Sequence, residues 1–161
     1  MAAPTIQWYK HSSVGHTAGS AVSELTLGTV TAGAWGVVKV ISFVPSGNTI
    51  DHTKFWLYDS VAVLSGGGNV SLGNSTRKWW FKAGDTTGLD AGLFSKTGAS
   101  VGTTLACDYH PSDNTAGAGL SLGTVTASSR SDYIYVSPQP GSMAYDGTYT
   151  DFAFQISYDF T

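Results

Sequence analysis

The end of the chain has the most regular pattern of hydrophobic and polar positions. From Phe152 onward, aromatic or aliphatic residues occupy every second position and alternate with Ala153, Gln155, Ser157 and Asp159. This two-residue period places the large apolar side chains on one face, as a half-buried antiparallel strand requires. The pattern predicts a strand over residues 149–160.

Similar patterns recur along the chain, separated by short clusters of turn residues. The other predicted strands cover residues 5–9, 36–44, 54–58, 61–64, 78–82 and 133–136. Segment 36–44 is apolar on both faces, which indicates a central position in a sheet. Two of these strands run into proline, at Pro45 and at Pro138. Because proline has no N–H to donate to a ladder, we expect both strands to stop before it.

Helical periodicity is absent from the pattern. No glycine-free window of about 11 residues has apolar residues at positions i, i+3, i+4 and i+7. The best candidate, Leu89–Phe94, is one turn long and contains Gly92. We therefore predict an all-β fold, an antiparallel β-sandwich of jelly-roll-like character with little or no helix.

One octapeptide occurs twice. Leu25–Ala32 returns as Leu120–Ala127, and the two copies differ only where Thr26 corresponds to Ser121. We interpret both copies as strands of one sandwich, each with a Leu-x-Leu face, a glycine kink or bulge and a β-branched end. Duplication of a whole half-domain is the alternative interpretation.

The chain length suits one domain. A chain of 161 residues buries enough surface for a core of its own. We divide it into an N-terminal arm, residues 1–20, and a single β-sandwich domain, residues 21–161. The arm combines the short aromatic strand 5–9 with a polar, histidine-bearing loop. We expect it to contact a neighbouring subunit, because a terminal strand can pair with an open sheet edge on another chain.

Charge is scarce in this sequence. Only 12% of the residues are charged and the net charge is −3, whereas about 25% is usual in globular proteins. The solvent-facing surface must therefore rely on Ser, Thr and Gly. The scattered Lys and Arg residues argue against nucleic acid as a partner, since phosphate binding needs a basic patch. No apolar run is long enough for a membrane span, and no signal peptide is visible.

Three fragments match motifs of the penicillin-recognising serine enzymes. They are Ser75–Lys78, Lys96–Gly98 and Ser112–Asn114. Their order along the chain differs from that of the family, and Ser75–Lys78 leads into the apolar strand 78–82 instead of opening a helix. We therefore predict no convergence of these residues, no catalytic residue and no enzymatic activity.

The sequence shows no metal or cofactor motif. The four histidines and the single cysteine, Cys107, have none of the spacings of metal sites. Asp108 and His110 are two residues apart on a predicted strand, where a surface hydrogen bond explains them. Asp85 and Asp90 flank a glycine and suit a turn. We expect Cys107 to be a small buried hydrophobe, and we expect no cofactor.

Aromatic residues are the class in surplus, with five Trp among them. Adjacent strand residues face opposite ways, so if one of Trp79 and Trp80 fills the core, the other lies at a surface, a contact between sheets or a subunit interface. Exposed tryptophan marks an interface or a ligand face. The candidate interface residues are Ile6, Trp8, Tyr9, Trp79 and Trp80. The same surplus leaves open a sugar-stacking platform.

The chain as a whole resembles auxiliary proteins of tailed-bacteriophage virions, most of all the capsid decoration (cement) proteins. The resemblance rests on the Met-Ala start, the Leu-x-Leu-Gly-Thr-Val-Thr-Ala strand, the segment Asn48–Leu57 and the closing aromatic strand. It implies a sandwich without catalytic residues that binds the major capsid protein or other virion proteins. It also implies a place on the capsid surface and a homo-oligomer, often a trimer. Baseplate and tail-tube proteins share these features.

The second class that the sequence leaves open is a carbohydrate- or receptor-binding β-sandwich, including a host-recognition part of a phage tail or baseplate. Its distinguishing property would be a tryptophan face that binds glycans.

Overall fold

The computed structural model describes residues 2–11, 19–59, 78–83, 120–139 and 152–160. All the regular secondary structure in these ranges is β-strand, which confirms the predicted class. Among the same residues there is no helix long and apolar enough to cross a membrane.

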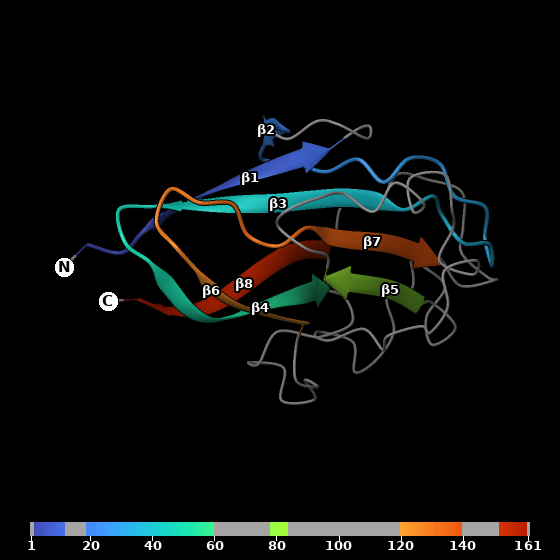
Figure 1. Ribbon diagram of the computed structural model, residues 1–161. Coiled ribbons are helices and arrows are strands. Elements are labelled where there is room, and N and C mark those ends of the chain that lie inside the picture. Colours follow the sequence, from blue (N-terminus) through green and yellow to red (C-terminus); the bar gives the residue numbers. More distant parts are fainter. Residues whose placement is uncertain (1, 12–18, 60–77, 84–119, 140–151, 161) are drawn as a thin grey trace.

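Eight strands are described, and all their pairings are antiparallel. They are β1 (Thr5–His11), β2 (Ser20–Val22), β3 (Lys39–Ser46), β4 (Ile50–Asp59), β5 (Lys78–Ala83), β6 (Leu120–Val125), β7 (Ile134–Gln139) and β8 (Phe152–Phe160). Their order is β2-β1-β3-β7-β5 in one sheet and β6-β4-β8 in the other (Figure 1). The short connection from β3 to β4 and the connection from β6 to β7 each cross from one sheet to the other.

The main core lies between the two sheets. Its buried members come from both of them and are Ile41, Phe43, Ile50, Phe55, Leu122, Val125, Ile134 and Val136. Trp8 of β1 meets Phe43 of β3 edge to face, with ring centroids 5.2 Å apart. Burying an aromatic or large aliphatic side chain of this kind contributes about 1.5–3 kcal/mol. The predicted antiparallel β-sandwich is therefore confirmed.

Strands β3 and β7 are buried on both faces. Residues that alternate with the main core form a second cluster on the outer face of the five-stranded sheet: Val38, Val40, Tyr133 and Tyr135, with Trp35 packed against them. Tyr135 and Ile134 are both fully buried although adjacent strand residues face opposite ways. The central position predicted for segment 36–44 agrees with this burial.

The expected strand ends at proline are wrong. β3 continues through Pro45, which pairs with Ile6, and β7 continues through Pro138, which pairs with Trp79. Gly36 lies beside Pro138 and donates its N–H to the proline carbonyl at 2.8 Å.

A serine side chain replaces the hydrogen bond that Pro138 cannot donate. The Oγ of Ser137 donates to the carbonyl oxygen of Gly36 at 2.6 Å. Gly36 must be small here, since a Cβ atom would lie 2.9 Å from Cγ2 of Val30 and 3.1 Å from Cδ of Pro138. Pro138 is tolerated inside the strand because Gly36 leaves room for its ring and the Ser137 hydroxyl hydrogen-bonds the Gly36 carbonyl.

The two copies of the repeated octapeptide differ in structure. Residues 120–125 form β6 and pair with β4, but residues 24–30 belong to no strand. The interpretation of both copies as strands is therefore wrong for the first. The predicted glycine kink is present in both, since φ is +86° at Gly28 and +66° at Gly123.

The N-terminal segment contributes two strands to the larger sheet. β1 lies between β2 and β3 and pairs with β3 from Thr5 to His11. β1 and β2 also pair across the predicted boundary between residues 20 and 21, where Lys10 is opposite Ser20. Residues 5–11 are thus an integral strand of the sheet, and the expected contact of this segment with a neighbouring chain stays a prediction.

Candidate functional site

A buried polar pair on the outer face of the five-stranded sheet is the first candidate. Ser42 of β3 alternates with the core residues Ile41 and Phe43 and so faces away from the second sheet. Its Oγ lies 2.8 Å from Nε2 of His11 on β1. The residues are 31 positions apart in sequence, and the antiparallel pairing of β1 with β3 brings them together.

An aromatic ring and a guanidinium group extend this polar pair. The ring of Tyr133 meets the ring of His11 edge to face at 4.9 Å. Nη1 of Arg130 donates to the hydroxyl of Tyr133 at 3.0 Å. Nε of Arg130 is buried and has no hydrogen-bond partner in the part of the chain that the structure describes. We refer to His11, Ser42, Arg130 and Tyr133 as the outer-face cluster.

The chemistry of the His11–Ser42 pair is limited by its burial. A serine hydroxyl within hydrogen-bond distance of an imidazole is the arrangement that activates a nucleophile. Here Ser42 is 0% exposed and His11 is 5% exposed. No substrate carbonyl can reach a side chain so enclosed, and the hydrogen bond instead satisfies two polar groups inside the fold. The outer-face cluster therefore has the properties of a structural network.

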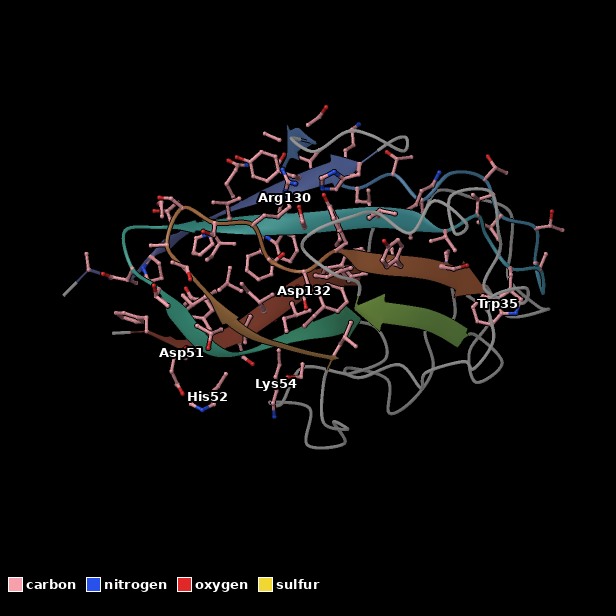
Figure 2. All side chains as sticks on the ribbon, in the orientation of Figure 1. Trp35, Asp51, His52, Lys54, Arg130 and Asp132 are labelled. Atoms are coloured by element: carbon pink, nitrogen blue, oxygen red, sulfur yellow. The ribbon has the colours of Figure 1, made fainter. Side chains whose placement is uncertain are left out.

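A second candidate lies at the start of β4. The register between β4 and β8 shifts between Asp51 and Lys54, and His52 inside this bulge has φ = +51°. Nδ1 of His52 lies 3.2 Å from Oδ2 of Asp159 on β8. His52 and Lys54 project away from the five-stranded sheet (Figure 2).

This bulge holds no metal-ligand set. Asp51 and Asp159 are opposite each other in the ladder, next to His52. Even so, no group of three or more His, Cys, Asp or Glu side chains able to hold a metal occurs within the described ranges. The two side chains of the His52–Asp159 pair are 83% and 79% exposed. A pair so exposed contributes little to stability.

The structure places the five predicted interface residues in two different strands, β1 and β5. Ile6 and Trp8 are partly buried and pack against the main core. Tyr9 is partly buried and lies opposite Ala21 of β2 and Ser42 of β3. Trp79 and Trp80 pair through their backbones with Pro138 and Ser137. The interface role of all five residues stays a prediction.

Most of the other sequence candidates lie outside the described residues. This applies to Ser75, Lys96, Ser112, Cys107 and the acidic residues between 85 and 108. Of the serine-enzyme fragments only Lys78 is described, as the first residue of β5.

Sequence reasoning missed the His11–Ser42 pair. The sequence showed only a histidine just after a predicted strand and a serine inside an apolar strand. Neither segment indicates that the two strands pair and bring these side chains together. It also missed that residues 24–30 belong to no strand that the structure describes.

Comparison with protein-family models, with curated proteins and with solved structures gives no match.

Proposed function

We propose that this chain is a non-enzymatic structural protein of a virion, a capsid decoration protein that binds the major capsid protein on the outer shell as a homo-oligomer. The fold supplies a β-sandwich, and the protein acts by adhesion through the surface of that sandwich. The resemblance of the sequence to capsid decoration proteins supports the proposal that the particle it binds is a virion.

The observation that carries the proposal is the chemistry of the exposed surface. Among the residues whose side-chain exposure the structure describes, the exposed ones of charged type are Lys10, Glu24 and Asp159. The others are mainly Ser, Thr, Gly and Ala, above all between residues 20 and 34 and between 121 and 129. Such a surface approaches another protein without desolvating many ions, which is the costly step in close contact.

Lattice geometry strengthens contacts that are weak individually. When several subunits bind neighbouring sites, the effective concentration raises avidity by roughly 10² to 10⁴. A low-charge surface also makes this binding insensitive to ionic strength, since few ion pairs are available to be screened.

The test is reconstitution with virions or shells from which the protein has been stripped. We expect saturable binding at a fixed ratio to the major capsid protein, little change between about 50 mM and 500 mM salt, and shells that resist heat better than bare ones. A protein that ignores shells and binds a defined glycan with a change in Trp fluorescence would overturn the proposal in favour of a carbohydrate-binding module.

A further inference from the structure

Residues 24–30 follow β2 and lie outside every strand and bridge that the structure describes. Within the described part of the chain, no hydrogen bond joins their backbone to another residue. Leu25 and Leu27 pack against the main core, whereas Thr26, Gly28 and Thr29 are exposed. The leucine side chains therefore anchor the segment, and its N–H and C=O groups have no partner among the described residues. Figure 1 draws it as a coil without an arrow, in the stretch of chain that leads from β2 to β3.

The second copy of the octapeptide shows what this sequence does when a partner strand is present. In β6, Leu122 and Val125 are buried in the main core and the backbone pairs with β4. Gly123 has positive φ there, as Gly28 has in the first copy. The first copy thus has the same kink and the same inward leucines as β6 but pairs with no strand in the described part of the chain.

We propose that residues 24–30 are a self-association strand, which pairs antiparallel with residues 24–30 of a second copy of this chain. The inference rests on the homo-oligomer of the proposed function and gives it a contact surface. An unpaired strand edge is a template for another chain, and proteins usually protect such edges with lysine or proline. Residues 25–30 contain neither.

Charge and symmetry favour a second copy as the occupant. Glu24 is the only charged residue of the segment. In an antiparallel pair centred between Thr26 and Gly28, each Glu24 lies opposite an uncharged residue of the other copy, so the like-charge repulsion that weakens cross-strand pairs is absent. The same surface is used on both copies, and such an isologous contact closes as a dimer.

Two matched lysine substitutions test the proposal. Thr29→Lys places a charge on the proposed contact, and Thr124→Lys places the same charge at the equivalent position of β6, where the residue is also exposed. Sedimentation equilibrium of the full chain should show a wild-type dimer. We expect Thr29→Lys to raise the dimer dissociation constant at least tenfold, and Thr124→Lys and Thr26→Ser to change it less than twofold.

Hydrogen exchange of the wild-type chain gives an independent measurement that does not depend on any variant folding. The amides of residues 25–30 should exchange more slowly as protein concentration rises through the dimer transition. A wild-type monomer, a wild-type trimer, concentration-independent exchange in this segment, or equal weakening by Thr29→Lys and Thr124→Lys would each overturn the self-association strand.

Shell binding separates the two proposals. A wild-type dimer that is weakened by Thr29→Lys but does not bind stripped shells supports the strand contact and contradicts the decoration function. A chain that binds shells but does not dimerise through residues 24–30 supports the decoration function and contradicts the self-association strand.

Discussion

The Oγ of Ser42 lies 2.8 Å from Nε2 of His11, on the side of the five-stranded sheet that faces away from the other sheet. The pair joins β1 to β3 at the C-terminal end of β1, where the ladder between the two strands ends. Because both side chains are buried, we assign the hydrogen bond a role in the stability of the fold, which mutation can measure.

Replacing Ser42 with Ala should lower the free energy of unfolding. The change removes a buried hydrogen bond to His11, which costs about 1–3 kcal/mol. Urea unfolding followed by Trp fluorescence measures this difference. Ser46→Ala is the control in the same strand, because the Ser46 hydroxyl is exposed and lies at a long 3.4 Å from the carbonyl of Thr5. Covalent labelling of Ser42 by a fluorophosphonate probe would contradict the structural role.

Replacing Gly36 with Ala should be costly because of close packing. The new Cβ would lie 2.9 Å from Cγ2 of Val30 and 3.1–3.2 Å from the ring of Pro138. Overpacking of this kind costs about 1–3 kcal/mol. A double-mutant cycle with Val30→Ala checks the cause, since removing the Val30 methyls should make Gly36→Ala less destabilising. Strict additivity of the two changes would show that the cost has another origin.

Replacing His52 with Gly should stabilise the protein. His52 has φ = +51°, a left-handed conformation that costs a non-glycine residue about 1–2 kcal/mol. Greater freedom of glycine in the unfolded chain offsets part of the gain, so we expect a net increase of about 0.5–1 kcal/mol in the free energy of unfolding.

Two further variants separate backbone strain from the contact between His52 and Asp159. His52→Ala removes the imidazole but keeps the strain, and Asp159→Asn removes the charge alone. Neither should stabilise the protein. If His52→Gly instead destabilises the protein as much as loss of a core contact does, the imidazole of His52 stabilises the bulge and the prediction is wrong.

The alternation of apolar and polar residues was sufficient to predict most of the sandwich. β1, β3, β5, β7 and β8 all coincide with predicted strands, because each has one or two apolar faces to bury. β2 was missed because three residues, Ser20–Val22, are too short to show a period. The error at Pro138 has a different cause. The hydroxyl of Ser137 and the glycine at position 36 remove the penalty, and they lie about a hundred residues apart in sequence.

The candidate site was much less predictable than the fold. A histidine and a serine on separate strands become partners only through register, and a one-residue slip would place them on opposite faces. Likewise, Leu25–Ala32 differs from Leu120–Ala127 only in having Thr26 where the second copy has Ser121, and this conservative difference does not explain why only the second copy forms a strand. Among the described residues, the second copy lies beside β4 and the first copy pairs with no strand.

The octapeptide repeat also has a consequence for the order of events during synthesis. The ribosome releases residues 25–32 and β4 well before it releases residues 120–127, so the first copy can reach the edge of β4 before the second copy, which finally occupies it as β6, has been made. We expect a transient non-native pairing between them, displaced when the second copy emerges. Hydrogen-exchange labelling of stalled nascent chains that end before residue 120 should find protection at the amides of Thr26 and Thr29 that is absent from the monomeric full-length chain. Equal exchange in the two would show that the first copy never competes.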